Sequence, residues 1–97
     1  MDMHEAFAAQ VLSVLKMLGS DAFAQERLGQ DQAWGEVEWD KLNLHGGSVS
    51  LGHPFGATGA RMVTTVAHEL HRTGTEHAVL GLCAAGGLGA GAVMQAL

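Results

Sequence analysis

The 97-residue sequence has few of the residues on which several classes of protein depend. It has one cysteine, which excludes an internal disulfide and a CxxC metal knuckle. Its five basic residues stand singly and the formal net charge is −5, so no basic patch is present to neutralise nucleic-acid phosphates. It also lacks a signal peptide and an 18-residue apolar run. We therefore expect no nucleic-acid binding, no metal site, no transmembrane segment and a cytoplasmic location.

What the chain does contain is apolar residues, at 47%, and 14 glycines. This apolar content excludes a disordered tail, and the length allows at most one small domain, residues 1–97. The glycines are not accompanied by serine- or proline-rich padding, and only one proline is present. They therefore indicate tight turns and close backbone approach rather than a flexible linker.

The first half of the sequence predicts two helices and a surface segment. Apolar residues at helical spacing predict an amphipathic helix over residues 5–18, with no element before it. Ser20 is a typical N-cap for a second, short helix that ends at Gly29. Residues 30–42 are polar apart from two tryptophans, and we expect those side chains to anchor a surface excursion.

The second half predicts an α/β layer. Residues 49–51 could form a very short strand, and residues 60–72 have the apolar face of a helix that Gly74 would cap. Apolar runs at 78–83 and 90–97 are joined by glycines, which indicates an antiparallel hairpin at a sheet edge. The predicted fold class is α/β, with helices packed on a small sheet that ends in this hairpin.

His53 is the first candidate for chemistry. The proline that follows it disfavours the helical conformation, so the histidine is held extended. Gly52 and Gly56 allow another backbone or a ligand to approach. An imidazole at this place can act as a base or donate a hydrogen bond to an oxyanion. The alternative is that the His-Pro pair only shapes a turn.

Cys83 and His4 are further candidates. Cys83 ends a predicted strand beside bare glycine amides, where a thiol could exchange a proton with a ligand or act as a nucleophile. The alternative is a small buried apolar side chain. His4 opens the first predicted helix, where a cation is unfavourable, so the ring should stay neutral. Its position alone favours a capping or surface role.

Three stretches taken together resemble a known family. Residues 4–8 read HEAFA, residues 46–59 read GGSVSLGHPFGATG, and residues 83–87 read CAAGG. Their order and spacing resemble the C-terminal end of thiolases over nearly the whole chain. The HEAFA form, where many thiolases have NEAFA, resembles the fatty-acid oxidation branch, which works beside a hydratase/dehydrogenase subunit.

The resemblance implies an acyltransferase that cleaves 3-ketoacyl-CoA with CoA, giving acetyl-CoA and a shortened acyl-CoA. In thiolases one cysteine becomes acylated, and the histidine matching His53 activates it. Cys83 matches the second cysteine, the acid/base for the acetyl carbon, and His4 matches a polar residue near the thioester oxygen. The resemblance also implies that Ala85, Gly86 and Phe7 line the oxyanion hole and the substrate. Many thiolases have glycine at the position of Ala85, and a positive φ there would be strained.

The resemblance also implies what accompanies this chain. The nucleophilic cysteine of thiolases lies in the N-terminal half, so we expect residues 1–97 to be a C-terminal domain truncated at its N-terminus. No cofactor is expected, because coenzyme A and acyl-CoA are substrates. Expected partners are the missing half, further copies of the chain and a hydratase/dehydrogenase subunit. The alternatives are an inactive fragment that mediates subunit interaction, or an acyl-CoA-binding module.

Overall fold

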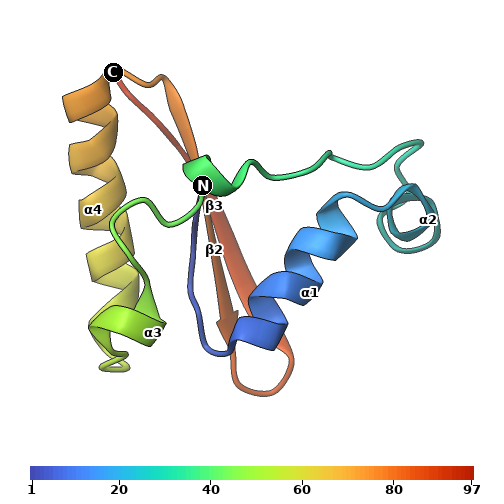
Figure 1. The fold of residues 1–97 in the computed structure, drawn as a ribbon, viewed down its shortest axis with the longest axis horizontal. Helices are drawn as coiled ribbons and strands as arrows, with labels where there is room; N and C mark the ends of the chain where they lie inside the picture. The colour runs from blue at the N-terminus through green and yellow to red at the C-terminus, as the bar shows by residue number, and fades with distance from the viewer.

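The computed structural model describes residues 1–97 and has a three-stranded sheet at its centre (Figure 1). The strands are β1 (Asp2–Met3), β2 (His77–Ala84) and β3 (Leu88–Gln95), in the order β1-β2-β3. β1 runs parallel to β2, and β3 runs antiparallel to it. The predicted α/β class is confirmed.

The C-terminal hairpin forms as the glycine pattern predicted. β2 and β3 pair from His77 opposite Gln95 to Ala84 opposite Leu88. The turn between them contains Gly86 and Gly87, whose φ angles of 84° and 74° lie in the region that favours glycine. β2 extends one residue past each predicted end, whereas β3 begins two residues earlier and ends two residues earlier than predicted, at Gln95.

One long helix covers one face of the sheet. α4 (Thr58–Thr73) ends at Gly74, which has φ 68° and donates its N–H to the Leu70 carbonyl. This is the predicted left-handed cap. The core consists of four buried side chains, three from α4 and one from β2: Met62, Val66, Leu70 and Leu80. The apolar spacing of residues 60–72 therefore predicted Met62, Val66 and Leu70 correctly, whereas Val63 and Ala67, expected on the same face, are exposed.

The N-terminal helix begins later than predicted. α1 (Ala8–Leu18) follows an extended Phe7, with φ −148° and ψ 144°. β1 lies before it, so the expectation that no element precedes this helix was wrong. A two-residue strand leaves no periodic pattern in the sequence, and its pairing with β2 depends on residues about eighty positions away.

The prediction for the segment after α1 was correct for its helical turns but wrong about the tryptophans that were expected to anchor it. Ser20 caps α2 (Asp21–Phe23) by accepting a hydrogen bond from the Phe23 N–H. The chain continues as a π-helical turn, η1 (Ala24–Leu28), and ends at left-handed Gly29. Farther on, η2 (Trp39–Lys41) is a single 3₁₀ turn. The tryptophans at 34 and 39 are 64% and 68% exposed, so they do not anchor this segment here.

The strand predicted at residues 49–51 is a short helix instead, α3 (Ser48–Leu51). The Ser50 hydroxyl donates to the Gly47 carbonyl, and the Gly47 N–H donates to the same hydroxyl. This local exchange closes the turn, and four residues are too few for alternation to distinguish strand from helix. None of the helices combines the length and apolar character that crossing a bilayer requires.

Candidate functional site

The predicted site residues lie toward one end of the sheet. The His4 N–H donates to the Gly81 carbonyl at 2.8 Å, so His4 continues the pairing of β1 with β2. Cys83 comes two residues beyond Gly81 on β2. Figure 1 shows α3 and the segment leading into α4 toward the end of the molecule where the arrow of β2 points. The fold thus brings the three motifs, which are distant in sequence, into one region.

His4 is held by a serine that the sequence did not single out. The side chain of His4 is 3% exposed, and its Nδ1 lies 2.8 Å from the Ser48 Oγ. Ser48 Oγ also accepts a long hydrogen bond, 3.4 Å, from Arg61 Nη2. Because the hydroxyl accepts from arginine, its own proton can go to His4 Nδ1. This arrangement favours the neutral ring with its proton on Nε2.

His53 faces His4, with ring centroids 4.2 Å apart and planes tilted by 42°. Its Nδ1 lies 2.5 Å from Thr58 Oγ1, and that hydroxyl donates to the Pro54 carbonyl at 3.4 Å. A hydroxyl that donates to a carbonyl can accept from His53 Nδ1. This arrangement favours the opposite tautomer, in which Nε2 carries the lone pair. The two rings therefore suit different roles, one as donor and one as acceptor.

The electrostatic surroundings keep His4 neutral. Burial lowers the pKa of His4 below its usual 6.5, and the neighbouring His53 and Arg61 lower it further. The carboxylate of Glu5 opposes this shift but contributes least. A neutral ring at pH 7 can donate a hydrogen bond to a developing oxyanion without first losing a proton.

Cys83 is partly exposed and makes no hydrogen bond with either histidine. Leu80 and Leu82 contribute to the core under α4, so the alternation of the strand directs Cys83 to the other face. The structure thus brings His4 and His53 into contact, and no hydrogen bond joins Cys83 to either ring. The role of Cys83 stays a prediction from the resemblance.

Of the residues predicted to line the oxyanion hole and the substrate, Ala85 and Gly86 lie in the hairpin turn between β2 and β3. The positive-φ residues there are Gly86 and Gly87, and Ala85 is not among them. Ala85 therefore carries no left-handed strain. Phe7 is 73% exposed, at the start of α1. Lining roles for Ala85, Gly86 and Phe7 stay predictions.

Several contributors were missed by the sequence reasoning. Ser48 and Thr58 orient the two histidines, and Arg61 and Glu5 surround them. All four lie within or directly beside the motifs already noted. Their hydroxyl, guanidinium and carboxylate groups were the available signal, but pairing them with a particular ring needs the three-dimensional arrangement.

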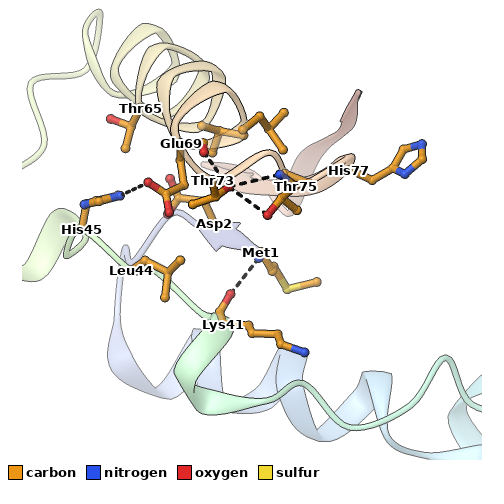
Figure 2. Close-up of a pocket in the computed structure, with 13 residues that line it drawn as sticks. Met1, Asp2, Lys41, Leu44, His45, Thr65, Glu69, Thr73, Thr75 and His77 are labelled. Carbon is orange, nitrogen blue, oxygen red and sulfur yellow. Dashed lines mark hydrogen bonds and ion pairs between the residues drawn. The ribbon is translucent and has the colours of Figure 1, made fainter. Parts of the chain in front are cut away.

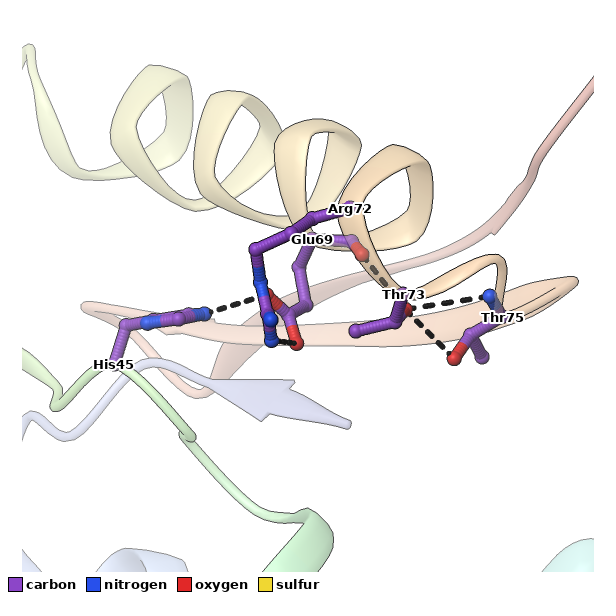
Figure 3. Close-up of polar contacts among 5 residues, drawn as sticks. All are labelled: His45, Glu69, Arg72, Thr73 and Thr75. Atoms are coloured by element: carbon purple, nitrogen blue, oxygen red, sulfur yellow. Dashed lines mark hydrogen bonds and ion pairs between the residues drawn. The ribbon is translucent and has the colours of Figure 1, made fainter.

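A cavity of about 370 Å³ lies elsewhere, between residues 41–45 and the facing ends of α4 and β2 (Figure 2). It does not include His4, His53 or Cys83. At its wall, Glu69 accepts hydrogen bonds from Arg72 and contacts His45 (Figure 3). These partners, Arg72 first, lower the pKa of Glu69 to about 2. No group of three or more His, Cys, Asp or Glu side chains is placed to hold a metal ion.

Comparison with known proteins identifies the family. Residues 1–96 match the model of the thiolase C-terminal domain. The chain is 57% identical over 94 residues to a 3-ketoacyl-CoA thiolase of Serratia proteamaculans, and 58% identical over 95 residues to one of Photobacterium profundum. These alignments cover 97% and 98% of the chain but only 22% of each relative.

Solved structures of thiolases also match the fold of this chain. Human mitochondrial 3-ketoacyl-CoA thiolase matches with a TM-score of 0.71 and 32% identity, and Bacillus anthracis acetyl-CoA acetyltransferase with 0.70 and 36%. Each match covers 99% of this chain and 20% of the solved chain. The chain therefore spans about a fifth of the length of these proteins, and it belongs to the thiolase C-terminal domain family.

Proposed function

We propose that this chain supplies the acid/base and oxyanion-binding part of a thiolase that transfers an acyl group between 3-ketoacyl-CoA and CoA. The observation that carries the proposal is the contact between His4 and His53 in a chain that matches the thiolase C-terminal domain. Their hydroxyl partners favour a donor on one ring and an acceptor on the other. Acyl transfer through a thioester needs both.

The covalent step requires a second cysteine. Cys83 is the only cysteine of the chain, and the resemblance gives it the acid/base role. The nucleophilic thiol must then come from a segment outside these 97 residues. His53 Nε2 accepts the proton of that thiol. The thiolate attacks the C3 carbonyl of the substrate, the C2–C3 bond breaks, and the acyl group stays on sulfur.

Cys83 completes both halves of the reaction. The electron pair of the broken bond passes to C2 of the departing acetyl-CoA, and the Cys83 thiol protonates that carbon. The resulting Cys83 thiolate then takes the proton of the incoming CoA thiol. The CoA sulfur attacks the acyl-enzyme and releases the first cysteine as a thiolate. No cofactor enters this sequence, because both coenzyme A species are substrates.

Charge on the substrate oxygens is stabilised by neutral donors. His4, buried and uncharged at pH 7, donates from Nε2 toward the thioester oxygen. The backbone N–H groups at Ala85 and Gly86 offer a second set of donors, and Phe7 lines the substrate path. We further propose that the working enzyme is a cytoplasmic homo-oligomer that cooperates with a hydratase/dehydrogenase subunit.

A chimera tests the proposal. Residues 1–97 replace the matching segment of the Escherichia coli 3-ketoacyl-CoA thiolase, a relative 57% identical over 95 residues. We expect the chimera to convert acetoacetyl-CoA and CoA to acetyl-CoA. Cys83→Ser and His53→Ala should each lower kcat by about 100-fold or more, because each removes a proton-transfer group.

Two controls complete the test. Ser13→Ala changes an exposed helical hydroxyl that bonds only the Ala9 carbonyl, so it should leave kcat unchanged. The 97-residue chain alone should show no turnover, since it lacks the nucleophile. A folded chimera without activity, or full activity in Cys83→Ser, would contradict the proposal. So would turnover by the chain alone above that of its Cys83→Ser variant.

A further inference from the structure

Glu5 is bonded through both of its carboxylate oxygens. Oε1 accepts a hydrogen bond from Asn43 Nδ2 at 2.7 Å, and Oε2 accepts one from the Val49 N–H at 3.0 Å. Glu5 follows His4 directly, whereas its two partners lie about forty residues away. The side chain therefore links the end of β1 to the first turn of α3.

Asn43 ties the same carboxylate to the free edge of β1. Its Oδ1 accepts the Met3 N–H at 2.6 Å, and its Nδ2 donates to the Met3 carbonyl at 3.0 Å. These are the two bonds that a neighbouring strand would make. Asn43 adopts φ 49°, a conformation that asparagine tolerates better than most residues. Asn43 thus holds the Met3 backbone before His4 and the Glu5 side chain after it.

Gly47 is shaped to receive this carboxylate. It is buried, and its backbone is extended, with φ −142° and ψ −168°, which any residue can adopt. A Cβ at this position would overlap the Glu5 carboxylate. The requirement for glycine at 47 therefore comes from Glu5 and not from the backbone conformation.

The Glu5 carboxylate contacts the residues on both sides of Ser48, the serine that holds His4. Ser48 lies between Gly47, against which the Glu5 carboxylate packs, and Val49, whose N–H the carboxylate accepts. We propose that Glu5 is a positioning residue, which clamps α3 against β1 so that Ser48 fixes the orientation of the His4 ring. The clamp itself depends only on the contacts within this chain. Its effect on catalysis rests on the proposed function.

A double-mutant cycle in the 97-residue chain tests the clamp. Gly47→Ala alone should raise the unfolding equilibrium constant about tenfold, because the Glu5 carboxylate must move away from the added methyl group and give up at least one hydrogen bond. In the Glu5→Ala background the same change should cost less than about threefold, because the overlapping carboxylate is gone. Gly56→Ala is the matched control, with open space around its Cβ and no positive φ. If Gly47→Ala raised the unfolding equilibrium constant equally in both backgrounds, the proposed clamp would be wrong.

Hydrogen exchange tests the bond itself. In Glu5→Ala no side-chain oxygen remains to accept from the Val49 N–H, so the Val49 amide should exchange at least about tenfold faster, as expected for a lost hydrogen bond. Glu26→Ala, a change at a carboxylate without partners, should leave that amide unaffected. Unchanged protection of Val49 in Glu5→Ala would count against the proposal.

Kinetics in the chimera test the positioning role. Glu5→Gln should lower kcat about tenfold or more with little change in KM, since a displaced ring weakens transition-state contacts. A KM effect alone would overturn the positioning of His4. If the unmodified chimera is inactive, the proposed function fails, while the mutant cycle and the exchange measurement still decide the clamp.

Discussion

The chemistry of each histidine is set by a hydroxyl neighbour. Both rings belong to motifs, but the motif does not say which nitrogen carries the proton. Ser48 bonds Nδ1 of His4 and also accepts from Arg61, whereas Thr58 bonds Nδ1 of His53 and donates to the Pro54 carbonyl. Two rings 4.2 Å apart can thereby divide the roles of donor and base.

The lowered pKa of His4 predicts a pH dependence of stability. The folded state binds the proton more weakly than the unfolded state, whose histidine titrates near 6.5. The contribution of neutral His4 to the free energy of unfolding is therefore complete above pH 6.5. It is lost as the pH falls from 6.5 through the lower pKa of His4 in the folded state. One proton limits the slope to about 1.4 kcal/mol per pH unit.

His4→Asn should remove this part of the pH dependence, because asparagine does not titrate. Urea denaturation at several pH values between 5 and 7.5, roughly the window of histidine titration, measures it. His71→Asn, a change on the exposed side of α4, is the control and should keep the slope of the unmodified chain. The prediction fails if His4→Asn loses stability on acidification as steeply as that chain does.

Among the elements, those with a long periodic pattern could be predicted. The apolar face of α4 repeats at Met62, Val66 and Leu70, and the two strands of the hairpin flank an obvious glycine turn. α3 could not be predicted, because four residues do not establish a period and a serine exchange decides the outcome. The sequence identified both histidines, while the Ser48, Thr58 and Glu5 contacts depend on residues brought together only by folding.

Gly74 should be the most sensitive cap, because it ends the helix that covers the core. Its φ is 68°, and a Cβ there would meet open space, so only backbone strain opposes a side chain. Gly74→Ala should destabilise the chain by about 1 kcal/mol, and Gly74→Asn by less, since asparagine tolerates this conformation. Thermal unfolding of the two variants measures the difference. Equal stability of Gly74→Ala and the unmodified chain would contradict the strain argument.

On the scale of the whole molecule, one face of the sheet lacks a cover. α4 packs on the side of Leu80 and Met94, and alternation directs Val93 to the other side, where it is 70% exposed. β3 is also an edge strand with few polar side chains. Apolar edges of this kind are typical contact surfaces between subunits or segments. The chain spans about a fifth of the length of its relatives.

We therefore expect the purified 97-residue chain to associate with itself through β3. Val93→Lys should shift its elution in size-exclusion chromatography toward the monomer, because a buried lysine without a partner opposes association. Gln95→Lys is the matched control: it adds the same charge to the same strand without removing apolar surface, and should elute as the unmodified chain does. A chain that is monomeric at all concentrations would contradict the prediction. Association unaffected by Val93→Lys would place the contact on another face.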